Sequence, residues 1–408
     1  IIVISCLTGY LLLVMVYCIP TKNMEAHVRE SVPIFLKEGD YPKVTDSTTS
    51  QLDNFTDALM LLKASYPMGE GKKVWEYALD ATRYDIKGES PVKALINCYG
   101  ENASEIDTIN YQHYWHGYLI FLKPILCVFS YAQIRYIIIV FQLGLFSLLV
   151  TRIYAIRKEF IVPTLIMWSF LNPIATMCSL QFNSILVLTF VSMILIIRFK
   201  ECWKGDLHKW KMFFLLIGIL TSYLDLLTYP LVTLGVPITL WLAIDFSIND
   251  KLRNSFISSV FWLIGYGGMW AGKWLLGSIV TGDAVIQRAM ERILVRTSSI
   301  AFDKDFTYGA VLKNELKLIW KYLFVVVVVL IIHFTIKSIQ GIIKSSLKDA
   351  VIYVIIGTYP FIWTFILKNH TYVHWWFVYR EFVITIYALL MMCFQQIGMT
   401  IRETKENV

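Results

Sequence analysis

Long apolar segments joined by short links make up most of this chain, and one polar stretch interrupts them near the beginning. Residues 1–19 are apolar, the mostly polar residues 20–133 follow, and apolar segments then continue to the end of the chain. Apolar runs of roughly 17–25 residues are typical of helices that cross a membrane. The pattern predicts ten spans, at 1–19, 134–152, 160–177, 182–198, 210–226, 228–246, 255–275, 316–335, 350–367 and 375–397.

The composition supports the same fold class. Hydrophobic residues form 57% of the 408 residues and charged residues 16%, whereas soluble domains carry about 25% charged residues. We therefore expect an all-α polytopic membrane protein of about ten transmembrane helices with a large helical extracytoplasmic first loop. The seven cysteines are scattered and form no C-x-x-C pair, so the sequence indicates neither a disulfide framework nor a zinc site.

Lysine and arginine predict the orientation. They gather in alternate links, around 152–158, 198–211, 251–253, 337–348 and 402–405, and such links lie on the cytoplasmic side of membrane proteins. We expect a multi-pass protein of the cell membrane with both termini cytoplasmic. The net charge of +7 is explained largely by these links and requires no nucleic-acid partner. The predicted parts are a first helix 1–19, an extracytoplasmic loop 20–133, helices 2–7 in 134–275, a second extracytoplasmic loop 276–315, and helices 8–10 with a short tail in 316–408.

One apolar segment is excluded from the spans. Residues 113–131 are apolar enough to cross a membrane, but an eleventh span would place Arg152, Arg157 and Lys158 outside. Their aromatic and histidine content, with Lys123-Pro124 in the middle, suits a helix that lies flat in the membrane interface. We expect this segment to close the first loop on the outer surface.

Two carboxylates in the first loop are the first candidates for chemistry. Asp53 and Asp57 are four residues apart, so a helix would place them on one face. Their proximity to each other and to lipid would raise at least one pKa, as suits a group that must accept a proton. The alternative is a solvated helix face on which Asp53 acts as the N-cap.

Two further groups contain cations and histidines near the outer membrane surface. His113, His116 and Lys123 lie on the interfacial segment, and the alternative for them is an aromatic belt with a snorkelling lysine. The second group precedes and enters the last span, where ionisable residues are functional suspects. It consists of Lys368, Asn369, His370, His374 and Arg380. These groups suit a phosphate leaving group, on which charge develops in the transition state; the alternative is an interface anchor in which Arg380 pairs with Glu381 or a neighbour.

A basic amphipathic helix is predicted in the second loop. Arg288, Arg292 and Arg296 recur every four residues between Asp283 and Arg296. Such a helix can lie on anionic head groups or guide a lipid phosphate. Asp225, at an outward hairpin, is either another functional carboxylate or the cap of a helix end.

The order of these elements resembles the GT-C superfamily of membrane glycosyltransferases that use polyprenyl-phosphate-linked sugars. Those enzymes have a first membrane helix, then a large outer loop with an Asp on a short helix, then a flat helix and an Arg that opens the second span. Asp53, Trp115-His116-Gly117-Tyr118-Leu119 and Ile134-Arg135-Tyr136 stand at the corresponding places, and Leu171-Asn172-Pro173 is also similar. The prolines of the family's flat-helix motif are replaced in this chain.

The resemblance implies a reaction and its partners. The donor would be a sugar on polyprenyl phosphate, and the acceptor a hydroxyl of a glycan, lipid or protein outside the cytoplasm. Asp53 or Asp57 would be the general base, the reaction would invert the anomeric carbon, and some of Lys123, Lys368, His370, His374 and Arg380 would stabilise the leaving phosphate. Asn369 and Trp375 would position the sugar. No cofactor is certain, because only some relatives use a divalent cation.

Other functions stay open. A polysaccharide or lipid transporter would place charged residues along a path through the spans, whereas here they gather at the outward ends. A non-catalytic membrane assembly subunit would keep the fold without needing either Asp. A membrane acyltransferase that uses His333 or His370 is the more distant enzymatic alternative.

Overall fold

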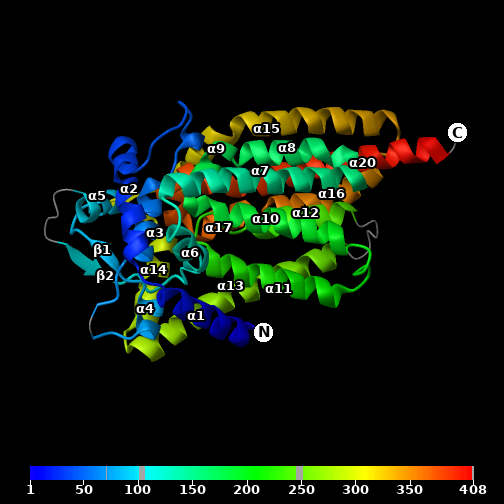
Figure 1. Cartoon of the computed structure of the whole chain (residues 1–408). Helices are drawn as coiled ribbons and strands as arrows, with labels where there is room; N and C mark the ends of the chain where they lie inside the picture. The colour runs from blue at the N-terminus through cyan, green and yellow to red at the C-terminus, as the bar shows by residue number, and fades with distance from the viewer. Residues whose placement is uncertain (70, 101–105, 245–250, 407–408) are drawn as a thin grey trace.

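The computed structural model describes residues 1–69, 71–100, 106–244 and 251–406, and these form a helical bundle with a cap at one end (Figure 1). The bundle helices are α1 (Ile2–Tyr17), α7 (Tyr131–Ile156), α8 (Ile161–Phe170), α10 (Leu180–Phe199), α11 (Leu207–Leu224), α12 (Val232–Ile244), α13 (Lys251–Thr281), α15 (Tyr308–Ile339), α16 (Ile343–Gly357), α17 (Tyr359–Ile366) and α20 (Val383–Glu406). Short helices join or extend some of them: η2 (Lys158–Phe160), α9 (Pro173–Cys178), α18 (Lys368–Val373), α19 (Trp375–Val378) and η4 (Tyr379–Phe382).

The cap combines the first loop with the second. Its helices are α2 (Lys22–Glu38), η1 (Thr48–Ser50), α3 (Asn54–Ala64), α4 (Val74–Asp80), α5 (Pro91–Tyr99), α6 (Leu119–Leu126) and α14 (Val285–Thr297). Two small antiparallel hairpins, which the sequence patterns did not predict, complete it: β1 (Arg83–Asp85) with β2 (Asp107–Ile109), and β3 (Ile300–Ala301) with β4 (Lys304–Asp305).

The helical fold class is confirmed, and the number of spans stays a prediction. Every predicted span overlaps one helix or a broken pair of helices, as 160–177 overlaps α8 and α9. Among the described residues, four helical stretches are long and apolar enough to cross a membrane alone: Tyr131–Ile156, Leu180–Phe199, Tyr308–Ile339 and Trp375–Gln396. A fifth is added if α1 and α2, bent by 81°, count as one span.

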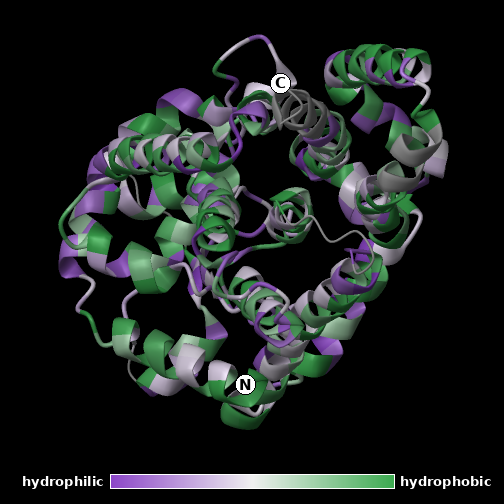
Figure 2. Ribbon diagram, turned by 90° about the vertical axis from the view of Figure 1, so that its right-hand side faces the viewer, coloured by the Kyte–Doolittle hydropathy of each residue, from purple (hydrophilic) through white to green (hydrophobic). Residues whose placement is uncertain are grey.

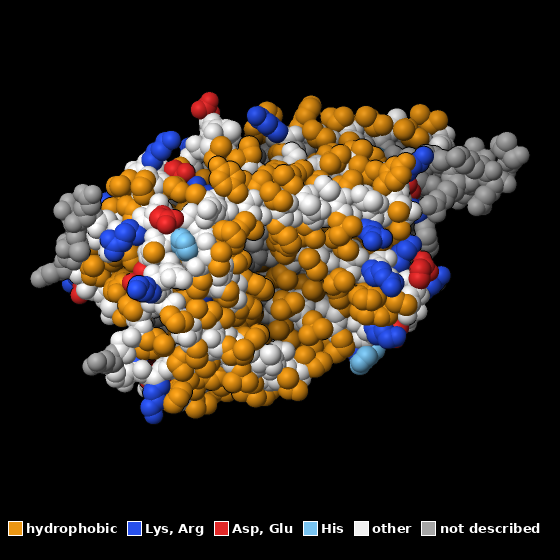
Figure 3. All heavy atoms as spheres, in the orientation of Figure 1, with side chains coloured by type: hydrophobic (Ala, Val, Ile, Leu, Met, Phe, Trp, Pro, Cys, Tyr) orange, Lys and Arg blue, Asp and Glu red, His pale blue; other side chains and the backbone are white. Residues whose placement is uncertain are grey.

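The surface and the interior both suit a lipid environment. Hydrophobic side chains cover the middle of the visible face, while most lysines and arginines on it lie toward the two ends (Figure 3). Seen along the bundle from the end opposite the cap, the helices carry hydrophobic residues on most sides (Figure 2). Close contact between α11 and α13 depends on Gly218 and Gly265, where a Cβ would collide with the backbone of the other helix, as is common between membrane helices.

Two local features of the sequence position the site. Asn172 adopts the left-handed conformation and caps α9, whose first residue is Pro173; Asn tolerates that conformation and Pro suits a first helical turn. The interfacial segment forms only the short helix α6 after a turn at His113–Tyr118. That segment therefore packs in the cap without spanning the bundle, as predicted.

Candidate functional site at the junction of cap and bundle

Asp53 begins helix α3, as one of the two interpretations of the sequence proposed. Its carboxylate accepts hydrogen bonds from the backbone N–H of Thr56 at 3.0 Å and from the Thr56 hydroxyl at 2.9 Å. Its own N–H donates to Ser179 Oγ at 3.0 Å, which joins the cap to the start of α10. Asp53 is 2% exposed, so the solvated helix face is wrong while the N-cap is correct.

Asp57 lies in α3 but caps the N-terminal end of another helix, α10. Its carboxylate accepts from the hydroxyl of Tyr131 at 2.6 Å and from the backbone N–H groups of Leu180 and Gln181 at 3.0 and 3.1 Å. Those N–H groups belong to the first turn of α10, where a negative charge is favourable. These bonds join α3 to α7 and α10, so Asp57 fixes α10 against α3; a role of Asp57 as the base stays a prediction.

Next to Asp57, Arg135 forms a bidentate ion pair with Glu38. Its Nη1 and Nη2 donate to the two carboxylate oxygens of Glu38 at 2.9 and 3.0 Å, and Nη2 also donates to Asn54 Oδ1 at 2.8 Å and to the Tyr131 hydroxyl at 2.7 Å. We call Glu38, Asn54, Asp57, Tyr131 and Arg135 the junction network. Sequence analysis noted Arg135 only as the residue that opens the second span.

Burial raises the pKa of both aspartates and so disfavours their ionised forms. Desolvation raises the pKa of Asp53 to about 7; the hydrogen bonds from Thr56 oppose the rise, and the charge of Asp57 adds to it. Desolvation raises the pKa of Asp57 to about 6, against the hydrogen bond from Tyr131 and the charge of Arg135. A carboxylate whose pKa is raised toward neutral pH suits a general base, and the pKa values of Asp53 and Asp57 are both raised in this way.

Arg380 approaches the same junction from the other side of the loop that contains η1. Its Nε donates to Leu171 O at 2.9 Å and its Nη2 to Thr49 O at 3.2 Å, while its guanidinium lies 4.5 Å from the ring centroid of Phe182. Nη1 is buried and has no hydrogen-bond partner among the described residues. The guanidinium therefore retains a free donor beside the loop that leads to Asp53.

The predicted pairing of Arg380 with Glu381 is wrong. One Glu381 oxygen accepts from the backbone N–H of Leu231 at 3.2 Å instead. Arg380 is fully buried, so it is not an anchor at the head groups either. Asn172 donates to Thr49 Oγ1 at 3.0 Å, and the loop around Thr49 thus brings together the Leu171-Asn172-Pro173 segment and Arg380.

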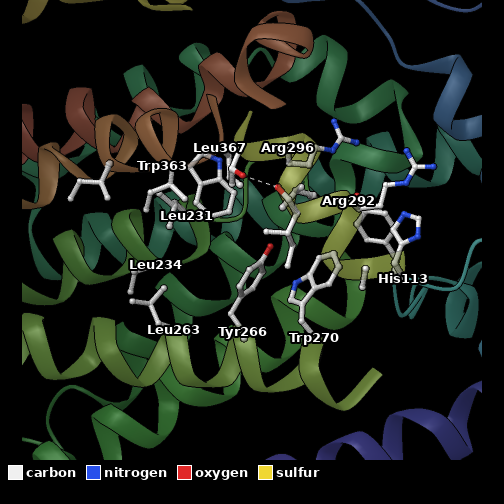
Figure 4. A pocket seen from close by; sticks show the side chains of 18 of the residues that line it. His113, Leu231, Leu234, Leu263, Tyr266, Trp270, Arg292, Arg296, Trp363 and Leu367 are labelled. Carbon is white, nitrogen blue, oxygen red and sulfur yellow. Dashed lines mark hydrogen bonds between the residues drawn. The ribbon is translucent and has the colours of Figure 1, made fainter. Parts of the chain in front are cut away.

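A large cavity lies between α13, α14 and α17 (Figure 4). It has a volume of about 850 Å³ and is lined mainly by apolar side chains of α12, α13, α14 and α17. Arg292, Arg296 and His113 lie at one end of it, and Leu234 and Leu263 at the other (Figure 4). An apolar interior with cations at one end has the amphipathic character of a lipid that carries a negatively charged head group.

The histidines between the cavity and Arg380 are neutral at physiological pH. Burial, with the nearby charge of Arg296, lowers the pKa of His374 to about 3, and burial also lowers the pKa of His370. The two rings are 4.9 Å apart, and His374 stacks on Phe377 at 5.1 Å. Burial likewise lowers the pKa of His113 to about 3. The cations expected from histidine are therefore absent at neutral pH, and arginine supplies the positive charge.

Two members of the first predicted cation group belong to the cap core. Lys123 donates to Ala64 O at 2.7 Å and is 1% exposed, so it neither snorkels nor faces the cavity. His116 has a positive φ of 56° and lies 3.1 Å from the Nζ of the buried Lys63 and 2.8 Å from Tyr111 O. Burial lowers the pKa of Lys63. Sequence analysis missed Lys63, because a lone lysine in an apolar helix shows no partner in the sequence.

Of the remaining predicted residues, Lys368 and Asn369 contact residues of the second loop. Lys368 lies over the ring of Tyr308 at 5.1 Å from its centroid, and Asn369 donates to Ile300 O at 2.5 Å. Asp225 is the C-cap residue of α11, and its carboxylate accepts from the N–H and hydroxyl of Thr228 in the turn that follows, at 2.9 and 2.5 Å. No contact of Trp375 with a sugar-sized site is evident in the described residues, because the cavity lining does not include it.

A divalent cation does not fit the aspartate pair. The Asp53 and Asp57 oxygens already accept from Thr56, Tyr131, Leu180 and Gln181. Within the described residues no three His, Cys, Asp or Glu side chains gather as ion ligands. No step below is therefore derived through a metal ion.

Comparison with known proteins gives no relative. No family model, no curated protein and no solved structure matches this chain. The arguments for its function consequently start from the geometry of the junction and of the cavity.

Proposed function

We propose that this protein is an integral membrane glycosyltransferase of GT-C type. It would move a sugar from a polyprenyl-phosphate donor to an extracytoplasmic hydroxyl with inversion. The observation that carries the proposal is the 850 Å³ cavity with its apolar interior and the arginine pair at one end. Helix α18 packs against α14, which lines the cavity, and α19 packs against α18 and against η1, the turn that precedes Asp53.

The cavity suits the donor in two ways. Its apolar interior would hold the first isoprenoid units, and burial of apolar surface contributes about 25 cal/mol per Å². Arg292 and Arg296 would bind the phosphate, because guanidinium groups donate bidentate hydrogen bonds to phosphate oxygens. An anion between them would also raise the pKa of the neighbouring His374 and turn that ring into a further donor.

The proposed reaction would use Asp53, Arg380 and the two arginines of the cavity. Asp53 takes the proton of the acceptor hydroxyl, the acceptor oxygen forms a bond to the anomeric carbon, and the bond from that carbon to the phosphate oxygen breaks. The lipid phosphate leaves as an anion with its electron pair, and Arg380 Nη1 with the cavity arginines stabilises the developing charge. Transfer requires α18 and α19 to move, since they connect α14 at the cavity with η1 before Asp53.

The test compares the wild type with Asp53→Asn in native membranes that contain polyprenyl-phosphate sugars. Asn caps a helix as well as Asp does, so this variant keeps the start of α3 and loses only the base. We expect release of polyprenyl phosphate to fall by about 10²–10⁴-fold at unchanged protein abundance. Asp57→Glu serves as the matched control for disturbance of the junction.

Each contrary result has a consequence. Unchanged release in Asp53→Asn would remove Asp53 from the mechanism. No release from the wild type with any donor sugar would favour a polysaccharide or lipid transporter, or an assembly subunit, for which the same cavity would be a transport or docking site.

A further inference from the structure

Three aromatic side chains from distant parts of the chain meet on the surface of the cap. The rings of Tyr41 and Phe55 are stacked, with centroids 5.8 Å apart and planes 10° apart. Tyr41 meets Trp376 edge to face at 5.4 Å. Tyr41 is 43% exposed and the other two are half-buried. We call Tyr41, Phe55 and Trp376 the aromatic platform.

The platform is built by a loop that folds back on the start of α3. Phe55 N–H donates to Asp40 O at 3.1 Å, and Leu52 N–H donates to Pro42 O at 2.8 Å. Gly39 has a φ of 68°, which glycine adopts without strain, and this turn at the end of α2 lets the loop fold back toward α3. The loop therefore holds Tyr41 against α3 on one side and against α19 on the other.

The platform lies directly beside the proposed base. Asp53 is two residues from Phe55, and burial, with a smaller contribution from the nearby charge of Asp53, raises the pKa of the Tyr41 phenol. Trp376 contacts Phe182 at 6.2 Å, and Phe182 lies under the guanidinium of Arg380. A molecule on the platform would therefore be next to both Asp53 and the route to Arg380.

The surroundings of the rings point to a carbohydrate. A pyranose has an apolar C–H face that packs on an aromatic ring, and hydroxyls at its rim that need donors and acceptors. The carboxylate of Asp40 precedes Tyr41 in the chain and lies close enough to add to the rise that burial causes in the pKa of its phenol, and its Oδ1 is buried without a hydrogen-bond partner among the described residues. The carboxylates beside the rings disfavour a phosphate or another anion.

We propose that the aromatic platform binds the acceptor and that the acceptor is a glycan chain, stacked so that one hydroxyl reaches Asp53. This inference rests on the proposed function and narrows its acceptor from a glycan, lipid or protein to a glycan. The donor then reaches α18 and α19 from the cavity, and the acceptor reaches them from the platform.

The test measures binding of soluble oligosaccharides to the full chain in detergent by saturation-transfer NMR. Maltohexaose, chitohexaose and mannohexaose are the probes, since they differ in linkage and in axial hydroxyls. We expect at least one to show transfer to its ring C–H protons, with an affinity about tenfold lower in Tyr41→Ala and Trp376→Ala. Tyr41→Phe keeps the ring and should bind as the wild type does. Trp75→Ala removes a ring of similar exposure on α4 and should also leave binding unchanged.

The outcomes separate this inference from the proposed function. Absence of transfer with all three probes, or equal affinity in Tyr41→Ala, would overturn the platform. If Asp53→Asn abolishes release of polyprenyl phosphate while Tyr41→Ala leaves the KM for the acceptor unchanged, the transferase stands and the platform fails. If the oligosaccharide binds through Tyr41 but the wild type releases no polyprenyl phosphate, the glycan site stands and the transferase fails.

Discussion

The junction network and the surroundings of Arg380 differ in how the charge of their arginine is neutralised. Arg135 forms a bidentate ion pair with Glu38, and its Nε has no hydrogen-bond partner among the described residues. Arg380 donates only to backbone carbonyls, and its Nη1 has no partner among the described residues. Buried charges are normally paired with an opposite charge. The difference indicates that the first region holds the fold together and that the buried cation of the second is suited to an anionic ligand.

The same comparison applies to the two aspartates. The Asp57 carboxylate accepts from donors of α7 and α10, which are far away in the sequence, whereas among the described residues the Asp53 carboxylate accepts only from Thr56 of its own helix. A group held by local bonds can change partner without separating two helices. This is why we assign structure to Asp57 and chemistry to Asp53, although four residues separate them.

The largest expected effect is loss of the ion pair in the junction network. Arg135→Ala leaves Glu38 without its bidentate partner and removes donors from Asn54 and Tyr131, and breaking such a pair costs about 3–5 kcal/mol. We expect the free energy of unfolding to fall by about that amount, measured by thermal or denaturant unfolding in detergent. Arg29→Ala, on the exposed side of α2, should change it by less than about 0.5 kcal/mol. Equal stability of both variants would contradict the structural role of the network.

Asp57→Asn should follow in size. The amide can accept at one oxygen, but its NH₂ would face an N–H donor of α10 or the Tyr131 hydroxyl. An unsatisfied buried donor costs about 1–3 kcal/mol, so stability should fall by about 2 kcal/mol. A melting temperature equal to that of the wild type, with activity lost, would instead make Asp57 the base.

The sequence predicted the fold class, the loop helix α14 and the cap residue Asp53, because each depends on local periodicity or on a residue beside its own helix. It could not predict that Asp57 caps α10, since that contact joins residues 123 positions apart. The burial of Lys63 beside His116 and the meeting of Tyr41 with Trp376 are long-range in the same way. Strands of two or three residues, such as β1 and β3, are too short to give an alternating pattern.

A third effect concerns the cavity. Arg292→Gln combined with Arg296→Gln removes two phosphate donors while retaining amides of similar reach. We expect the KM for the polyprenyl-phosphate sugar to rise about 30-fold, which corresponds to about 2 kcal/mol, with little change in melting temperature. Arg288→Gln on the same helix is the control, because Arg288 pairs with Asp283 at 3.1 Å and does not line the cavity. Equal KM in both variants would mean that Arg292 and Arg296 do not bind the donor phosphate, and contact with anionic head groups would be the remaining role for α14.

A last expected effect is a gain of stability on removing the charge of Asp53. Its folded-state pKa of about 7 is above the ordinary value of 3.8, so the folded protein holds the proton more tightly than the unfolded chain does. Stability therefore falls as the pH rises from about 4 to about 7 and stays lower above that range. Asp53→Asn keeps the cap and has no charge to bury, so at pH 8 it should be more stable than the wild type; the rise of the pKa from 3.8 to about 7 limits this gain to about 4 kcal/mol. The gain should largely disappear at pH 4, where Asp53 is protonated in the folded protein and close to its ordinary pKa in the unfolded chain; Asp57 titrates in both proteins and cancels. Unfolding at pH 4, 6 and 8 measures this difference. A gain of equal size at all three values would mean that Asp53 carries no buried charge at neutral pH, and would remove the physical basis for its role as the base.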